Sequence, residues 1–173
     1  MIAEHFIRTS LDATKLASQT VHVTGIGGGL RRANLDDLDR VLGLDHIAPI
    51  VHERSELLTS RVHSREVIVF EEHDRLLGFA VVKARAFFGR DFVELLTVVV
   101  DNRRRGVGTV LLEEAVRESS TDRIFTSTNR SNDEMIGLLN KTGWQFSGQL
   151  EGVDEGDPEL VYYKDSLAVS PSR

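Results

Sequence analysis

Apolar residues recur along the chain with two periods, and these periods predict where helices and strands lie. An apolar residue every three or four positions is typical of a helix with one buried face, whereas alternation or a short apolar run is typical of a strand. The helical spacing predicts four helices, at residues 34–44, 53–63, 106–119 and 131–142. The strand patterns predict seven strands, at residues 21–24, 66–71, 76–87, 92–100, 123–127, 145–150 and 160–163.

The order of these elements indicates the fold class. One strand is followed by two helices, then by three successive strands, and then by helix, strand, helix and two strands. Such a mixture is typical of an α/β domain with a single central sheet. The last helix is expected to begin with a capping box, Ser131 and Glu134, and to end at Gly143.

The length of 173 residues suits one domain with a core of its own. We expect residues 1–20 to form an N-terminal arm, residues 21–165 to form the domain, and residues 166–173 to form a flexible tail.

The composition excludes several kinds of chemistry. The chain has no cysteine, which rules out disulfides, cysteine-ligated zinc and a cysteine nucleophile, and its six histidines do not cluster, so we expect no metal site. With 21 basic and 27 acidic residues the net charge is −6, which disfavours binding to nucleic acid. Without a long apolar stretch or a signal-peptide pattern, we expect a cytoplasmic protein that does not contact membranes.

The most informative segment is residues 98–109, where an apolar strand leads through a basic, glycine-containing turn into a helix. The first N–H groups of a helix have no partners inside it, and glycine lets the backbone approach an oxyanion closely. Arg103, Arg104 and Arg105 add forked donors at a position where a helix start normally favours acidic residues. This pattern favours a phosphate site, and the alternative is a solvated basic loop. It is not a Walker A motif, and Leu111 stands where the dinucleotide fingerprint needs its third glycine.

Arg103, Gly106 and Gly108 after an apolar strand resemble the acetyl-CoA pyrophosphate loop of the GNAT acetyltransferase superfamily. Asn132 and the helix after it, which ends in Lys-Thr-Gly-Trp at 141–144, are similar to the second hallmark of that superfamily. The resemblance spans about residues 21–165. It implies an α/β fold with a central mixed, mostly antiparallel sheet flanked by helices, and acetyl-CoA as co-substrate without a metal.

The resemblance also implies which residues meet the cofactor. Backbone groups of Val98 and Val100 would pair with the pantetheine arm, and the amide of Val98 or Val99 would lie near the thioester oxygen. Asn132 would bond to the cofactor or to neighbouring backbone. The pyrophosphate would be held by the backbone amides of Arg103, Arg104, Arg105, Gly106, Val107, Gly108 and Thr109.

Acetyl transfer to an amine also needs a group that removes a proton. Glu94 is the candidate base, because strand alternation places it on the same face as Leu96 and Val98. Its alternative role is an ion pair with Arg85 or Lys83 on the neighbouring strand.

A general acid for the leaving thiolate is harder to assign. Many members of the superfamily carry a tyrosine four residues before the glycine of the Gly-aromatic pair, and here Leu139 stands there. Tyr163 is the candidate, with Tyr162 and Ser131 as alternatives, although each tyrosine also suits core packing. A mechanism without a dedicated acid stays open.

The acceptor is expected to be a small-molecule or peptide amine. Five acidic residues and no Lys or Arg lie between 145 and 163, and an acidic rim would steer a polyamine, an amino sugar or a basic peptide toward the site. These are Glu151, Asp154, Glu155, Asp157 and Glu159. The alternative is a solvated hairpin loop.

Two other segments are further candidates for the acceptor site. Phe87 and Phe88 would line the cleft or merely pack against other side chains, and residues 25–29 would form a mobile connection or a lid over the acceptor.

These observations predict an acetyl-CoA-dependent N-acetyltransferase in which the amine attacks the thioester directly in a ternary complex, since no cysteine can carry the acyl group. Two alternatives stay open: a catalytically weak sensor that binds CoA or acyl-CoA with the same fold, and a nucleotide-binding regulatory domain. Because dimers are common in families of this kind, a homodimer is a further hypothesis.

Overall fold

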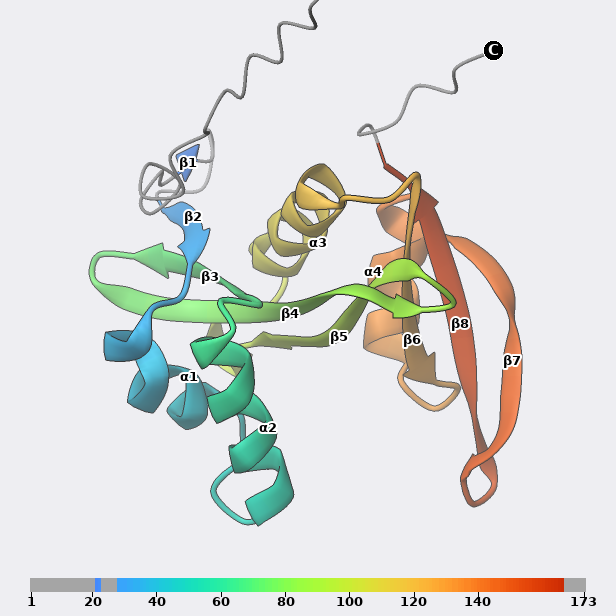
Figure 1. Ribbon diagram of the computed structural model, residues 1–173, viewed down its shortest axis with the longest axis horizontal. Helices are drawn as coiled ribbons and strands as arrows, with labels where there is room; N and C mark the ends of the chain where they lie inside the picture. The colour runs from blue at the N-terminus through green and yellow to red at the C-terminus, as the bar shows by residue number, and fades with distance from the viewer. Residues whose placement is uncertain (1–20, 23–27, 167–173) are drawn as a thin grey trace, which may run out of the picture.

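The computed structural model describes residues 21–22 and 28–166, which fold around one sheet (Figure 1). The strand order is β1-β2-β3-β4-β5-β6-β8-β7, and every neighbouring pair is antiparallel except β5 and β6, which are parallel. The strands are β1 (Val21–His22), β2 (Gly29–Arg32), β3 (Val67–Glu72), β4 (Arg75–Phe87), β5 (Arg90–Val98), β6 (Arg123–Asn129), β7 (Gln145–Asp154) and β8 (Asp157–Asp165). The predicted arm at 1–20, nearly all of the predicted tail at 166–173 and most of the glycine-rich stretch 25–29 lie outside the described residues.

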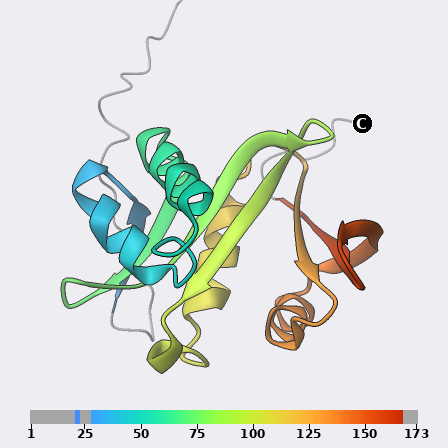
Figure 2. The same ribbon diagram turned by 90° about the horizontal axis from the view of Figure 1, so that it is seen from below.

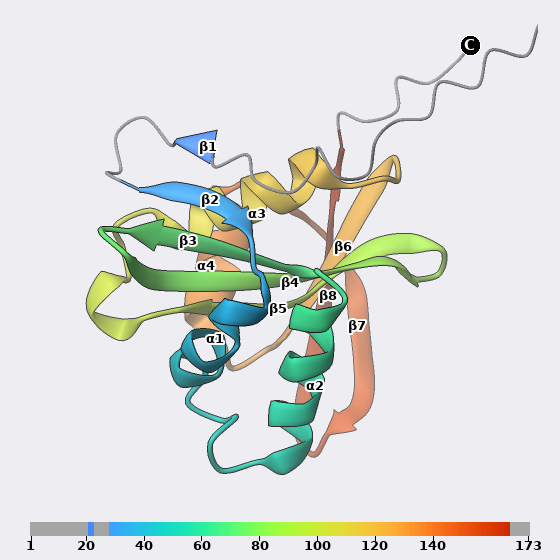
Figure 3. The same cartoon turned by 60° about the vertical axis from the view of Figure 1, so that its left-hand side comes forward.

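Helices cover both faces of this sheet, as Figures 2 and 3 show. On one face lie α1 (Leu38–Leu44), which follows a 3₁₀ turn (Leu35–Asp37), and α2 (His52–His63). On the other face lie α3 (Val107–Glu118) and α4 (Asp133–Lys141). The predicted fold class, a mixed and mostly antiparallel sheet flanked by helices, is confirmed.

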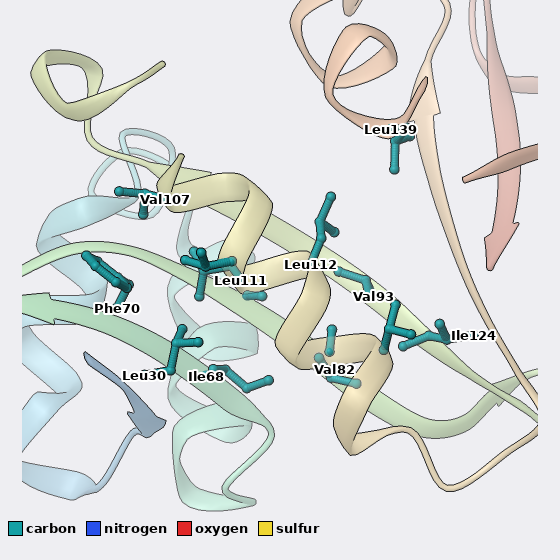
Figure 4. Packing of buried hydrophobic residues seen from close by; sticks show 14 of the residues in the cluster. Leu30, Ile68, Phe70, Val82, Val93, Val107, Leu111, Leu112, Ile124 and Leu139 are labelled. Atoms are coloured by element: carbon teal, nitrogen blue, oxygen red, sulfur yellow. The ribbon is translucent and has the colours of Figure 1, made fainter. Parts of the chain in front are cut away.

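The larger of the two cores lies between the sheet and α3. One side of α3 is buried, and its side chains meet apolar residues of β3, β4 and β5 (Figure 4). Leu111 and Leu112 are fully buried there, and Leu139 of α4 extends the same core toward β6. Burial of apolar side chains on one stripe of a helix fixes its orientation on the sheet, and thereby fixes where the helix begins.

The structure differs from the predicted elements at two places. It contains the strand β2, which the pattern does not predict because Gly-Leu-Arg-Arg has little strand character. This strand is secured by Arg31, which binds the buried carboxylate of Asp37 at 2.6 Å. The strand predicted at 92–100 ends at Val98, and Val100 begins a 3₁₀ turn (Val100–Asn102) with 70% of its surface exposed. The predicted strand at 92–100 is therefore two residues too long at its end.

The strands β5 and β6 separate soon after they meet. Their parallel pairing covers three residues of each strand, from Asp91 opposite Ile124 to Val93 opposite Thr126. β5 then continues to Val98 while it stays paired with β4 on its other side. We call this separation the β5–β6 parting; its foot lies at Val93, and it widens toward the carboxyl ends of both strands (Figure 2).

A β-bulge lies at the foot of the parting. Two consecutive residues of β4, Val81 and Val82, lie opposite Leu95 and Val93, so Glu94 has no partner on β4. An extra residue of this kind bends the strand and breaks the alternation of its side chains.

Because of the bulge, the Glu94 side chain points to the opposite face of β5 from Leu96 and Val98. Strict alternation would place all three on one face. Leu96 and Val98 pack against the core beneath α3, whereas Leu95 packs against the core beneath α2. The Glu94 carboxylate lies on the α2 side, where it pairs with Arg61. The prediction that Glu94, Leu96 and Val98 share a face is therefore wrong, because one extra residue shifts the period by one.

Asp91 holds three segments together at the foot of the parting. Its buried carboxylate accepts hydrogen bonds from the N–H of Arg85 at 2.9 Å, the N–H of Ser120 at 2.6 Å and the hydroxyl of Ser119 at 3.1 Å. Burial raises the pKa of Asp91, but these donors outweigh burial and hold the pKa below its ordinary value. The carboxylate thereby ties the β4–β5 hairpin to the turn after α3.

We expect Asp91→Asn to lower the free energy of unfolding by about 2–3 kcal/mol at pH 7, because the amide cannot accept from all these donors. The folded pKa of Asp91 lies below the unfolded value of about 3.9, so its stabilisation is present above that pH and is lost as the pH falls through the folded pKa. The difference between the two proteins should therefore shrink below about pH 4. Urea denaturation of both proteins at pH 7 and below about pH 4 measures this difference in the free energy of unfolding.

The matched control is Asp39→Asn, which changes an exposed carboxylate on α1 and should stay within about 0.5 kcal/mol of the parent protein. Equal stability of the two variants at pH 7 would contradict the role given to Asp91.

Candidate functional site

The edge of β5 that faces the parting presents backbone groups that the sheet does not use, although Nε of Arg103 lies 3.5 Å from the carbonyl oxygen of Val98. The N–H of Val99 donates to the carbonyl of Leu77 on β4 at 2.9 Å. Because successive residues of a strand point their backbone groups to opposite sides, the N–H groups of Leu96 and Val98 face away from β4 and into the parting. Of the two amides predicted near a thioester oxygen, that of Val98 faces into the parting, whereas that of Val99 donates to β4. Val100 lies beyond the strand, so its backbone does not belong to this edge.

Apolar side chains form a wall along the α3 side of the parting. They pack on the larger core but are only partly buried, and they come from β5, α4 and β8, so they lie on both sides of the parting. The wall consists of Leu96, Val98, Met135, Leu138 and Leu160. Partly exposed apolar side chains that flank free backbone groups suit an extended ligand with both apolar and amide parts.

The start of α3 follows the wide end of the parting. Gly106 precedes the helix in the left-handed region, with φ 91°, and offers no side chain to cap it, and the first turn has no acidic residue. The N–H groups of Val107, Gly108 and Thr109 consequently have no partner within the helix and suit an anion. Val107 is itself buried, so it would contribute its backbone alone.

Two glycines bring this helix start close to the sheet and to α4. A Cβ at Gly108 would lie 2.9 Å from Cδ2 of Leu138, and a Cβ at Gly78 of β4 would lie 2.7 Å from the carbonyl oxygen of Thr97 and 3.1 Å from Cγ1 of Val107. Position 78 therefore needs glycine, because a backbone atom blocks a side chain there, whereas at Gly108 the end of the Leu138 side chain would have to move. Pattern analysis does not identify Gly78, although a glycine inside an apolar strand is a known sign of close approach.

The three arginines before α3 differ in what they contact. Arg103 pairs with Glu134 of α4 at 2.7 Å, and Arg105 pairs with Glu72 of β3 at 3.1 Å. Arg104 is exposed, has a left-handed backbone with φ 61°, and has no ion pair among the described residues. The positive charge left for an anion is therefore mainly that of Arg104, together with the N–H groups of the helix.

Asn132 caps α4. Its Oδ1 accepts from the N–H of Met135 at 3.1 Å, while the hydroxyl of Ser131 donates to Asp157 at 2.6 Å. The predicted capping box with Ser131 as the first residue is therefore wrong, because Ser131 bonds to β8 instead. The Nδ2 group of Asn132 remains as a donor for a ligand or for neighbouring backbone.

Glu94 lies beside the foot of the parting in a two-pronged ion pair. Nε of Arg61 donates to its Oε2 at 2.7 Å and a terminal nitrogen donates to its Oε1 at 3.2 Å. The same arginine lies 3.4 Å from Glu66, and the hydrogen bonds from Arg61 to Glu94 raise the pKa of Arg61. The partner is thus Arg61 of α2 rather than Arg85 or Lys83. Sequence gives no signal for this contact, since α2 and β5 lie far apart in the chain.

The tyrosines of β8 lie away from the parting. The hydroxyl of Tyr163 donates to Gln145 on the edge strand β7 at 2.7 Å, and its ring packs beside Phe125 and Arg123. Tyr162 is buried in the larger core. The contact with Gln145 holds the Tyr163 hydroxyl at the edge strand, away from the parting.

The predicted acidic loop is mostly strand, because β7 continues to Asp154 and β8 begins at Asp157. Asp154 accepts from Nδ2 of Asn129 at 2.7 Å and Asp157 holds Ser131, so these two carboxylates have structural partners.

Within residues 21–22 and 28–166, no three or more His, Asp or Glu side chains gather so that they could hold a metal ion. No helix in this part of the chain is long and apolar enough to span a membrane.

The sequence model of the Acetyltransferase (GNAT) family matches residues 35–144. This range includes β5 with its bulge, the basic turn, α3 and α4.

Solved structures and a curated relative agree with this match. An acetyltransferase of the GNAT family from Bacillus cereus ATCC 10987 is 33% identical, with a TM-score of 0.75 over 81% of this chain and 98% of that one. The structure of yncA from Salmonella typhimurium with acetyl-CoA is 18% identical, with a TM-score of 0.65 over 85% of this chain and 97% of that one, and shares the fold. The peptidyl-lysine N-acetyltransferase YjaB of Escherichia coli is 29% identical over 91 residues, which are 53% of this chain and 56% of that protein. The chain thus spans just over half the length of that curated relative.

We expect Arg104→Gln to weaken the binding of CoA about fivefold, or about 1 kcal/mol, because the substitution removes one charge from an anion site built largely of backbone N–H groups. The loss should be smaller at high salt, where exposed charges are screened. Calorimetric titration with CoA at low and high salt measures both effects.

Arg65→Gln is the control, because Arg65 is also an exposed arginine with a left-handed backbone, φ 56°, but belongs to the turn after α2. Equal losses of affinity in the two variants would argue against an anion site at Arg104.

Proposed function

The chain belongs to the Acetyltransferase (GNAT) family and is therefore an acyltransferase that uses acetyl-CoA, and we propose that it moves the acetyl group to a primary amine by direct attack in a ternary complex. The amine would belong to a cationic small molecule or to a basic peptide. One observation carries the proposal: the β5–β6 parting has a helix start suited to an anion at its wide end and the Glu94 carboxylate beside its foot.

The residues along the parting fit acetyl-CoA in charge and polarity. Arg104 and the N–H groups of 107–109 would hold the pyrophosphate. The backbone of Leu96 and Val98 would pair with the amides of the pantetheine arm, and the apolar wall would contact its aliphatic part. Bound there, acetyl-CoA supplies an acetyl group activated as a thioester.

Glu94 is the proposed base. Its side chain is 24% exposed and lies on the opposite face of β5 from the apolar wall, so an acceptor can approach it without crossing the cofactor. An amine with a pKa of about 10.4 is almost fully protonated at pH 7, and forming the neutral amine costs roughly 4–5 kcal/mol. Glu94 would take this proton directly or through one water. Arg61 would position the carboxylate, which keeps lone pairs free for the amine.

In the proposed step the nitrogen lone pair forms a bond to the thioester carbonyl carbon, and the carbon–sulfur bond breaks. Glu94 has by then taken the ammonium proton, and the electron pair of the broken bond leaves with sulfur. The second proton, which nitrogen loses as the amide forms, passes to this sulfur and gives the free thiol. The N–H group of Leu96, the nearer of the two to Glu94, would stabilise negative charge on the carbonyl oxygen, while that of Val98 pairs with the pantetheine arm. Because the Tyr163 hydroxyl bonds to Gln145, we assign the thiolate no dedicated acid.

Two observations support a cationic amine as the acceptor. Glu155 and Glu159 remain on the β7–β8 hairpin after Asp154 and Asp157 have met their structural partners, and would attract an ammonium group. The name of the Escherichia coli relative, a peptidyl-lysine N-acetyltransferase, supports an amine within a peptide.

We expect Glu94→Gln to lower the rate of acetyl transfer about 100-fold at pH 7. The loss should narrow as the pH rises toward about 10, because the acceptor then arrives as the neutral amine. Release of free thiol from acetyl-CoA, followed with a panel of amines, amino sugars and basic peptides across this pH range, measures the rate.

Glu66→Gln is the matched control, because Glu66 also pairs with Arg61 but is not placed at the parting, and we expect its rate to stay within about threefold of the parent rate. If the rate of acetyl transfer by Glu94→Gln were reduced by the same factor at every pH, this would contradict the role of Glu94 as the base. Tight binding of acetyl-CoA without thiol release toward any amine would favour a CoA-binding sensor.

A further inference from the structure

A pocket of 410 Å³ lies between the tip of the β4–β5 hairpin and the strands β6, β8 and β7. This volume is within the range of small-molecule sites, and such sites are mostly lined by apolar and aromatic side chains. Its walls include Phe87, Phe88, Phe125, Leu150 and Val161, and among the described residues that line it none is acidic.

The pocket faces the same side of the sheet as Glu94. The ring of Phe87 stacks on that of Phe92 with 5.4 Å between their centroids, and lies 5.0 Å from that of Phe125. Phe92 and Glu94 are two residues apart on β5 and both precede the break in alternation, so their side chains point the same way, about 6.5–7 Å apart. A group bound in the pocket therefore lies on the same face of the sheet as the position proposed for the reacting amine, with Phe92 between the two.

The hairpin tip that closes the pocket has an unfavourable residue in its turn. Phe88 and Gly89 join the paired residues Phe87 and Arg90, with φ values of 48° and 75°. Two residues with positive φ are typical of a type I′ turn, which favours Asn-Gly and disfavours a bulky first residue. Phe88 is also 93% exposed. A strained and exposed aromatic side chain at the rim of a pocket indicates a role in binding rather than in folding.

We propose that this pocket binds an apolar group of the acceptor, so that the enzyme prefers primary amines that carry an aromatic or branched aliphatic group a few bonds from the nitrogen. The inference rests on the proposed function, because Glu94 marks where the nitrogen lies. The apolar group passes over Phe92 and enters the pocket against Phe87 and Phe125, while Glu159 on the same face of β8 attracts the ammonium charge.

Gly148 allows the pocket to be filled without disturbing the fold. It lies on β7 opposite Val161, so a side chain there would point to the pocket face of the sheet. A Cβ at Gly148 would have no other atom within 4 Å, and the same is true of Gly137 on α4, which lines no part of the pocket. Gly148→Leu and Gly137→Leu therefore form a matched pair.

The test compares 2-phenylethylamine with ethylamine as acceptors in the thiol-release assay. For the parent protein and for Gly137→Leu, we expect kcat/KM to be at least about tenfold higher for 2-phenylethylamine, since its ring is buried in the pocket. In Gly148→Leu this preference should fall to about twofold or less, while ethylamine keeps its kcat/KM, because the leucine occupies the space of the ring.

Phe88→Asn gives a second and independent measurement. Asparagine suits the turn, so the melting temperature should stay equal or rise, while the preference for 2-phenylethylamine should fall about fivefold. A variant that is more stable and less selective cannot be explained by loss of folding.

Several outcomes would overturn the inference. Equal kcat/KM for the two amines in the parent protein, a preference unchanged in Gly148→Leu, or a tenfold preference for spermidine over 2-phenylethylamine would each contradict an apolar subsite. A change in oligomeric state in Gly148→Leu with an unchanged preference would make the pocket a contact between copies. In all these cases thiol release still occurs, whereas its absence with every amine would contradict the proposed function instead.

Discussion

β5 and β6 share three residue pairs and then separate, and the position of every candidate group depends on that separation. If the pairing continued, the N–H groups of Leu96 and Val98 would be used in the ladder and the apolar wall would be fully buried. The bulge at Glu94 turns β5 away, and the Asp91 carboxylate secures the strands just before they part. Unpaired backbone groups flanked by apolar side chains are costly unless a partner satisfies them, and the proposed pairing with the pantetheine arm of acetyl-CoA would supply that partner.

The bulge also divides the chemistry between the two faces of β5. The side chains that would meet the cofactor point toward α3 and α4, whereas Glu94 points toward α2 and the acceptor side. With unbroken alternation the base and the cofactor wall would lie on one face, and the acceptor and the pantetheine arm would compete for the same space. In the proposed mechanism, one inserted residue would thus let two substrates approach the same point of the strand from opposite sides.

Much of the fold, and the basic glycine-containing turn between β5 and α3, could be predicted from sequence because both depend on local patterns: the periods of apolar residues, and glycines with arginines between a strand and a helix. The ion pairs could not be predicted, because each joins elements that are distant in the chain. Arg61 pairs with Glu94, Glu72 with Arg105, and Glu134 with Arg103. The face of Glu94 could not be predicted either, because a bulge leaves the apolar pattern of β5 almost unchanged. β2 escaped prediction because a buried carboxylate, not an apolar face, secures Arg31.

Hydrogen exchange at single backbone amides of β5, measured by NMR with and without acetyl-CoA, tests most directly whether the cofactor pairs with the edge of this strand. In the free protein the amides of Leu96 and Val98 should exchange faster than that of Val99, which donates to Leu77. Saturation with acetyl-CoA should slow exchange at Leu96 and Val98 at least about tenfold, together with residues 107–109, and leave Val99 nearly unchanged. Full binding with no added protection at Leu96 and Val98 would contradict the placement of the cofactor in the β5–β6 parting.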